Sequence, residues 1–154
     1  MKVAVGCDHA GFELKHVALD IVRNLGHEPV DLGTDSTDPV DYPAYAEKVG
    51  RAIQRGEVER GVLICGSGVG AAVAACKMRG VRAGLCHDTY SAQQAVEHDD
   101  VNVLALGARV IGEETARTLI EIFLAATFSG EERHVRRLAM IRALEDAQSA
   151  QGAK

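Results

Sequence analysis

The stretch GVLICGSGVG, at residues 61–70, joins an apolar run to a glycine-rich turn. The apolar run closes on Cys65, and three glycines follow within the next five residues. A short apolar run that ends at glycine is typical of a buried strand, and residues 71–78 beyond the turn are rich in helix formers. The stretch therefore predicts a strand, a tight loop and a helix, with a thiol at the carboxyl end of the strand.

The same alternation of short apolar runs and longer amphipathic segments continues along the chain. We predict strands at residues 2–6, 28–32, 61–65, 82–86 and 102–106. We predict helices at residues 11–26, 44–55, 71–78, 90–97, 113–128 and 132–148. Strands that alternate with helices indicate a parallel sheet covered on both faces. The expected fold class is α/β, a Rossmann-like three-layer α/β/α arrangement with a five-stranded parallel sheet and an extra C-terminal helix.

Length and composition indicate one domain with no membrane or nucleic-acid function. The 154 residues are enough for a single core, and we assign residues 1–150 to one domain and residues 151–154 to a polar tail. The formal net charge of -5 offers no basic field for nucleic acid. No segment approaches the roughly 18 apolar residues of a membrane span, and the N-terminus does not resemble a signal peptide, so we expect a cytoplasmic protein.

The four cysteines lack the spacing of a zinc finger or of a redox pair, so we expect free thiols and no bound metal. Cysteine often fills space in a core, and this interpretation is kept for Cys7, Cys76 and Cys86. Cys65 differs because a glycine loop and a helix start follow it directly. A thiol in such a position can act as a base or as a nucleophile.

Chemically active side chains stand at the ends of several predicted strands. They are Asp8, His9, Cys65, His87, Asp88 and Arg109. Ligands of parallel α/β sheets bind beyond the carboxyl ends of the strands, so we expect these residues at one edge of the sheet. Each residue taken alone is an ordinary loop residue of an α/β protein, but together they favour a binding site.

The loop at residues 66–70 suits an anion, because its backbone N–H groups and the helix start can face a phosphate or a developing oxyanion. It is not a P-loop, since no Gly-Lys-Ser/Thr sequence follows it. A dinucleotide-binding loop stays open as an alternative, with Asp88, about 20 residues further on, as the ribose ligand. That fingerprint normally follows the first strand, however, and gives the thiol of Cys65 no role.

Two further groups of candidate site residues lie away from the carboxyl ends of the strands. Arg133 and Arg137 lie four residues apart on one predicted helical face, which suits a phosphate clamp or a solvated face balanced by neighbouring glutamates. His98 lies in the acidic segment before the last strand, which fits a capped turn better than a metal site. A turn before a parallel strand lies at the amino edge of the sheet. A catalytic His98 would therefore have to come from a second subunit.

Six separate motifs follow one another along nearly the whole chain. Together they indicate a protein family more specifically than the glycine loop alone. They are GCDHAG at 6–11, DYP at 41–43, GVLICGSGVG at 61–70, YSAQ at 90–93, EHDDVNVLALGARV at 97–110 and RHVRR at 133–137. Together they resemble type B ribose-5-phosphate isomerase, a sugar-phosphate isomerase family that also contains galactose-6-phosphate isomerases.

The resemblance implies an aldose–ketose isomerase of the pentose phosphate pathway that interconverts ribose 5-phosphate and ribulose 5-phosphate through an enediolate, without a metal or other cofactor. It implies Cys65 as the base, His98 as the acid that opens the furanose ring, and Ser67 as a hydroxyl beside the substrate oxygens. The substrate-binding residues that it implies are Asp8, His9, Gly66, Gly68, Val69, Gly70, Asp99, Arg109, Arg133 and Arg137. It also implies a homodimer, or a tetramer of such dimers, with active sites shared between subunits.

The sequence departs from the family pattern at two positions. Asp99 and Cys76 stand where the family usually has asparagine, and a carboxylate at 99 cannot donate a hydrogen bond to the substrate as an amide does. Some members carry a glutamate base just after the glycine loop, where this chain has Ala71. Alternatives stay open: an isomerase of allose 6-phosphate, galactose 6-phosphate or a tetrose phosphate, or a sugar-phosphate binding module without catalysis.

Overall fold

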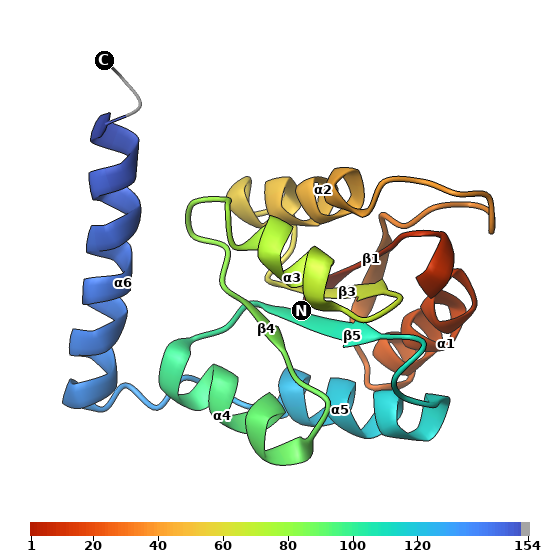
Figure 1. The fold of residues 1–154 in the computed structure, drawn as a ribbon. Helices are drawn as coiled ribbons and strands as arrows, with labels where there is room; N and C mark the ends of the chain where they lie inside the picture. The colour runs from red at the N-terminus through yellow and green to blue at the C-terminus, as the bar shows by residue number, and fades with distance from the viewer. Residues whose placement is uncertain (152–154) are drawn as a thin grey trace.

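The computed structural model describes the backbone of residues 1–151 and the side chains of residues 1–147. Its centre is a sheet of five parallel strands in the order β2-β1-β3-β5-β4 (Figure 1). The strands are β1 (Lys2–Cys7), β2 (Glu28–Asp31), β3 (Arg60–Cys65), β4 (Ala83–Leu85) and β5 (Val103–Gly107). The predicted five-stranded parallel sheet is confirmed, and β5 lies inside the sheet while β4 forms its edge.

Helices cover both faces of the sheet (Figure 1). In chain order they are η1 (His9–Gly11), α1 (Phe12–Asn24), α2 (Tyr42–Gln54), α3 (Val69–Ala75), α4 (Thr89–Asp99), α5 (Glu113–Ala125) and α6 (Glu132–Gln151). Apolar side chains of α1, α4 and α5 join the core on one face, and those of α2 and α3 join it on the other. The predicted three-layer α/β/α architecture is confirmed, with α6 as the extra C-terminal helix.

The three central strands carry the core. β1, β3 and β5 are buried almost from end to end, with side chains such as Val5, Leu63 and Leu104 at no more than 1% exposure. A strand covered on both faces needs a continuous apolar sequence, which explains why these runs were recognisable. The edge strand β4 is shorter than the predicted residues 82–86, and none of its three residues is fully buried.

Helix boundaries differ from the prediction for local reasons. α2 begins at Tyr42 rather than at residue 44, because Pro43 is favourable in the first turn of a helix. α5 ends at Ala125 rather than at 128, since the backbone of Ala126 is already extended. α6 continues to Gln151, so the first residue of the predicted polar tail is helical, and residues 152–154 lie outside the described residues.

The strand order reverses between β1 and β3. The chain leaves β1 into α1 on one face of the sheet and leaves β3 into α3 on the other. Connections that diverge in this way open a crevice beyond the carboxyl ends of the strands, where α/β proteins bind ligands. Asp8 and Cys65 stand side by side at this crevice, since the N–H of Asp8 donates to the carbonyl of Ile64 at 3.3 Å.

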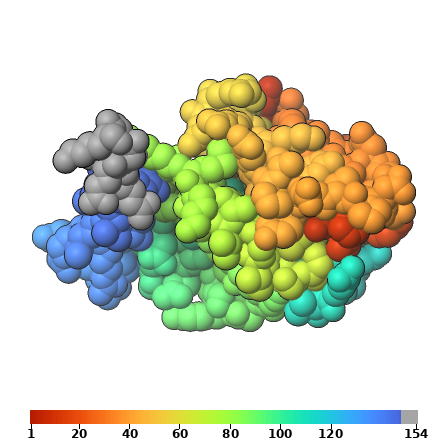
Figure 2. Space-filling view, turned by 45° about the horizontal axis from the view of Figure 1, so that its top comes forward, coloured from red at the N-terminus to blue at the C-terminus, as the bar shows by residue number. Residues whose placement is uncertain are grey.

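α6 stands beside the α/β body instead of joining its layers (Figure 1), and Figure 2 shows it in blue at one end of the molecule. Arg79 forms an ion pair with Asp146 of α6, and the N–H of Gly80 donates to the carboxylate of Glu145. The exposed apolar side chains of this helix are Val135, Met140, Ile141 and Leu144. α6 therefore presents an apolar surface that its own protomer leaves uncovered.

Lys15 of α1 is a buried charge with defined partners. Its side chain is 2% exposed, and Nζ lies 3.0 Å from Oδ2 of Asp31 and donates to the carbonyl of Thr34 at 2.8 Å. Phe12 contributes its ring, whose centroid is 5.3 Å from Nζ. These contacts attach the start of the long segment between β2 and α2 to α1.

We expect Lys15→Ala to lower the free energy of unfolding by about 2–4 kcal/mol, because a fully buried side chain leaves a cavity. Lys15→Met keeps most of the volume, and the partly exposed Asp31 can then be hydrated, so this change should cost less than about 1.5 kcal/mol. Urea unfolding of both variants measures the difference. Equal losses would show that the ion pair, not the filled volume, stabilises this region.

Candidate active site

Cys65 ends β3, and the glycine loop that follows holds its sulfur. The backbone N–H of Gly68 donates to Sγ at 3.1 Å, and the N–H of Val69 donates to Oγ of Ser67 at 3.3 Å. An N–H group directed at sulfur stabilises negative charge there. The thiol and the hydroxyl predicted to be catalytic therefore both lie at the start of α3.

The first turn of α3 presents further N–H groups. Its first intrahelical hydrogen bond runs from the N–H of Ala72 to the carbonyl of Gly68 at 3.0 Å. The N–H groups of Gly70 and Ala71 consequently have no acceptor within the helix. Clustered backbone N–H groups can stabilise an oxyanion. The geometry is compatible with the cradle predicted at residues 66–70 and adds Ala71 to it.

Glycine is required where the loop touches the neighbouring strands. Gly68 has a φ of +83°, and a Cβ at this position would lie 2.5 Å from Cδ1 of Leu85. A Cβ on Gly107, at the end of β5, would lie 2.6 Å from the carbonyl oxygen of Ser67. The loop lies directly on the ends of the strands, and this close approach is possible because neither position carries a side chain.

Arg109 lies beside the loop, as its place after the last strand predicts. Its N–H donates to the carbonyl of Gly66 at 3.0 Å, and the N–H of Ala108 donates to the carbonyl of Cys65 at 2.8 Å. The guanidinium also approaches the loop, since a Cβ on Gly66 would lie 3.4 Å from Nη1 of Arg109. An exposed cation therefore stands next to the N–H cluster.

Asp8 and His9 lie at the same edge, and both have structural partners. Oδ1 of Asp8 accepts the N–H groups of Ala10 at 2.9 Å and Gly11 at 3.1 Å, which caps η1. Nδ1 of His9 accepts the N–H of Val40 at 3.1 Å. These contacts fix the carboxylate of Asp8 and leave Nε2 of His9 as the ring nitrogen that can meet a ligand.

Tyr42 belongs to this edge although the sequence pattern did not indicate it. Its ring lies against the glycine loop, because a Cβ on Gly70 would be 2.7 Å from Cζ and 3.1 Å from the hydroxyl of Tyr42. Tyr42 is the first residue of α2 and is 41% exposed. The DYP motif was the available signal, since its proline marks the helix start that carries the tyrosine.

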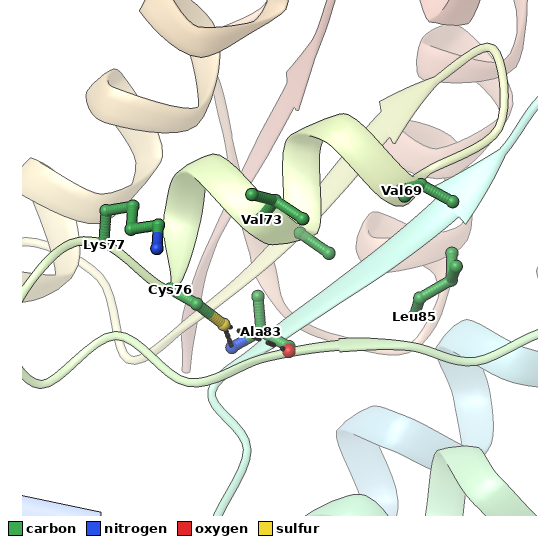
Figure 3. Close-up of a pocket in the computed structure, with 7 residues that line it drawn as sticks. Val69, Val73, Cys76, Lys77, Ala83 and Leu85 are labelled. Atoms are coloured by element: carbon green, nitrogen blue, oxygen red, sulfur yellow. Dashed lines mark hydrogen bonds between the residues drawn. The ribbon is translucent and has the colours of Figure 1, made fainter.

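The other three cysteines differ from Cys65 and from one another. Burial raises the pKa of Cys7 to about 11, and burial together with the charge of Asp88 raises the pKa of Cys86. Both thiols are buried, as their predicted packing role requires. The same prediction is wrong for Cys76, which is exposed because it ends α3 beside the edge strand. Its Sγ accepts the N–H of Ala83 at 3.3 Å and lies 3.4 Å from the carbonyl oxygen of the same residue (Figure 3).

The contacts of Asp88 weigh against the dinucleotide alternative, and His87 next to it has a structural partner. Oδ1 of Asp88 accepts the N–H of Ser91 at 2.8 Å as the N-cap of α4, and this hydrogen bond lowers the pKa of Asp88. Nε2 of His87 accepts the N–H of Gly107 at 2.9 Å. A carboxylate that caps a helix is poorly placed to bind a ribose hydroxyl.

The remaining predicted site residues form a second group near the amino edge of the sheet, which we call the α4–α6 group. They are His98, Asp99, Arg133 and Arg137. The five residues of β5 span about 16 Å between this end and Gly107, which pairs with Cys65. The structure therefore brings Asp8, His9, Cys65, residues 66–70 and Arg109 together, but it does not bring the α4–α6 group to them within one protomer.

Contacts within the α4–α6 group are local. The ring of His98 stacks on that of His134, with centroids 4.1 Å apart. Nε of Arg133 lies 2.9 Å from Oε2 of Glu131, whereas Arg137 has no ion pair among the described residues. Asp99 lines a groove beside Ile141 and Leu144 of α6.

An apolar groove of about 430 Å³ lies between α3 and β4 (Figure 3). Its lining includes Val69 of the glycine loop, Val73 and Leu85, all of them exposed. Throughout the described part of the chain, no three His, Cys, Asp or Glu side chains gather to hold a metal ion. No helix within residues 1–151 has the length and apolar character to cross a membrane.

Comparison with known proteins identifies the family. A family model described as Ribose/Galactose Isomerase matches residues 3–141. The chain belongs to the ribose/galactose isomerase family. Ribose-5-phosphate isomerase B of Escherichia coli is 46% identical over 94% of this chain and 96% of its own length. D-erythrulose-4-phosphate isomerase of Pectobacterium atrosepticum is 42% identical over 84% of this chain and 86% of its own length.

Solved structures of ribose/galactose isomerases agree with this assignment. Ribose-5-phosphate isomerase B of Clostridium thermocellum has a TM-score of 0.94 at 40% identity, covering 96% of this chain and 99% of that chain. Type B ribose 5-phosphate isomerase of Trypanosoma brucei has a TM-score of 0.91 at 46% identity, covering 93% and 97%. The resemblance inferred from the six motifs is confirmed, and the chain is an enzyme of the isomerase class.

The raised pKa of Cys7 predicts a loss of stability at alkaline pH. The unfolded thiol loses its proton near pH 9, whereas the buried thiol keeps its proton until about pH 11. The unfolded state therefore binds fewer protons in this window, and the free energy of unfolding should fall between pH 9 and 11 by up to about 2.7 kcal/mol.

Urea unfolding at several pH values between 8 and 11 measures this slope, with Cys7→Ala as the control. The variant should be less stable at pH 8 but should lose less stability as the pH rises. Parallel curves for the two proteins would contradict a role for this thiol.

Proposed function

We propose that the chain interconverts ribose 5-phosphate and ribulose 5-phosphate, with Cys65 as the base. The observation that carries the proposal is the thiol held by the N–H of Gly68 beside the free N–H groups of Gly70 and Ala71. Removing a proton from a carbon next to a carbonyl needs a base and donors for the oxygen that becomes negative. Both lie within one loop.

The reaction follows from this arrangement. The thiolate of Cys65 takes the proton from C2 of the open-chain aldose, and the electron pair of that bond forms the C1–C2 double bond of the enediolate. The negative charge gathers on O1, where the N–H cluster stabilises it. Cys65 returns its proton to C1, while the proton on O2 moves to O1, with the hydroxyl of Ser67 next to both oxygens. The product is the ketose, and no redox partner is needed.

Ribose 5-phosphate enters as a closed furanose, so a ring-opening step comes first. His98 donates a proton to the ring oxygen O4 as the C1–O4 bond breaks, and the O1 hydroxyl gives its proton to solvent water as the carbonyl forms. Asp8, His9 and Asp99 contact the sugar, and Arg109, Arg133 and Arg137 bind the phosphate. Guanidinium groups suit this role because their paired N–H donors match phosphate oxygens.

These roles require a second subunit. Proton transfer needs contact at about 3 Å, whereas β5 alone places about 16 Å between the two ends of the sheet. A homodimer in which the α4–α6 group of one protomer meets Cys65 of its partner is the smallest assembly that completes the site. The exposed apolar surface of α6 and the groove between α3 and β4 (Figure 3) supply area for such an interface.

A tetrose phosphate is the second candidate substrate, because the relative from Pectobacterium atrosepticum carries the name D-erythrulose-4-phosphate isomerase. Turnover of ribose 5-phosphate, erythrose 4-phosphate, allose 6-phosphate and galactose 6-phosphate separates the candidates. We expect the highest kcat/KM for ribose 5-phosphate. If ribose 5-phosphate is the poorest of the four, or if none turns over, the proposed substrate is wrong.

Complementation tests the base and the shared site together. Cys65→Ala and His98→Asn should each lose isomerase activity on ribose 5-phosphate by a factor on the order of 10²–10⁴. In a 1:1 mixture refolded together, half of the dimers are hybrids with one intact site of two, so about a quarter of the wild-type activity should return.

Cys65→Ala mixed with Cys65→Ser is the matched control, since no hybrid of these two restores a base. Native mass spectrometry confirms that hybrids form. Inactive hybrids of Cys65→Ala and His98→Asn would contradict the shared site, and an unchanged rate in Cys65→Ala alone would contradict the proposed base.

A further inference from the structure

His98 is held in place by two residues that are not among the predicted catalytic groups, His134 and Gln94. Its ring lies face to face with His134 of α6, with a centroid distance of 4.1 Å and an interplanar angle of 28°. On its own helix, Nδ1 of His98 lies 3.1 Å from Nε2 of Gln94. A stacked neighbour on one side and an amide on Nδ1 leave little freedom for the ring.

His134 is itself fixed by the segment between α5 and α6. Its Nδ1 lies 2.7 Å from Oγ of Ser129, and Oγ of Ser129 also accepts the N–H of Glu131 at 3.3 Å. The N–H of Ser129 donates to the carbonyl of Glu97, the residue before His98, at 2.9 Å. One serine therefore fastens α4 and His134 to the same point, which sets the distance between the two rings.

His134 is 1% exposed, and among the described residues its ring contacts a serine hydroxyl and a histidine ring. Burial lowers the pKa of His134, and the charges of His98, Arg133 and Arg137 lower it further, against the opposite effect of Glu131. These effects favour the neutral form of His134. A neutral ring presents its face to His98 without opposing a proton there.

We propose that His134 is the positioning residue of His98 and that it acts by holding the imidazole of His98 against its own ring face in the orientation that opens the sugar ring. This inference rests on the proposed role of His98. His134 makes no contact with the sugar in this account, and it acts only through the neighbouring ring.

Solvent exchange separates this role from a structural one. From ribulose 5-phosphate, Cys65 can remove a proton from C1 and return one to the same carbon through the enediolate, and this cycle never forms the furanose. Conversion to ribose 5-phosphate ends in ring closure, which is the reverse of ring opening and uses the same group. A ring-opening defect should therefore lower kcat/KM by the same factor in both directions, as the equilibrium constant requires, and leave solvent-deuterium exchange at C1 of ribulose 5-phosphate nearly unchanged.

The experiment compares His134→Ala with His134→Phe, which keeps a ring at the same place. For His134→Ala we expect kcat/KM in both directions to fall by about 10-fold, as the loss of orientation of a general acid implies, and solvent-deuterium exchange at C1 of ribulose 5-phosphate to stay within about twofold. His134→Phe should recover kcat/KM for ribose 5-phosphate to within about threefold of the wild type, because the stacked face is restored.

Leu138→Ala is the matched structural control, since Leu138 is a buried residue one turn further along α6. It should lower isomerisation and C1 exchange by the same factor, if it lowers them at all. Equal losses of isomerisation and C1 exchange in His134→Ala, an unchanged kcat/KM, or a His134→Phe variant as poor as His134→Ala would each overturn the inference. A wild-type protein that does not turn over ribose 5-phosphate would instead contradict the proposed function.

Discussion

The close approach between the glycine loop and the end of β5 is the constraint on which the site depends. Gly107 leaves no space for a side chain beneath the carbonyl of Ser67, and the N–H groups of Ala108 and Arg109 hold the same segment. These contacts hold the loop on the sheet, with the N–H of Gly68 directed at Cys65. The donor at the thiol is thus positioned by backbone packing.

Much of the fold could be predicted because the central strands are buried on both faces and their sequences are continuously apolar. The strand order could not be predicted, since nothing local in residues 82–86 shows that β4 lies outside β5. The residues at the carboxyl edge followed from their places after the strands. Tyr42 and His134 did not, because their roles depend on contacts between segments far apart in sequence: Tyr42 with Gly70, and His134 with His98.

The separation of the two groups of site residues also follows from chain connectivity. α4 runs from Asp88, at the carboxyl edge, back toward the start of β5, and His98 lies in its last turn. Any residue there is kept away from Cys65 by the length of the strand that follows. The separation of the two predicted groups within one protomer is therefore a result of the architecture.

Cys76 shows how one side chain affects the edge of the sheet. The N–H and carbonyl of Ala83 point away from β5, toward the open side of β4, and the sulfur of Cys76 meets both of them (Figure 3). Unpaired groups on an edge strand are a template on which another chain can add a strand. The sulfur meets the outward N–H and carbonyl of Ala83, so at this residue the edge strand offers no unpaired backbone groups on which another strand could extend the sheet.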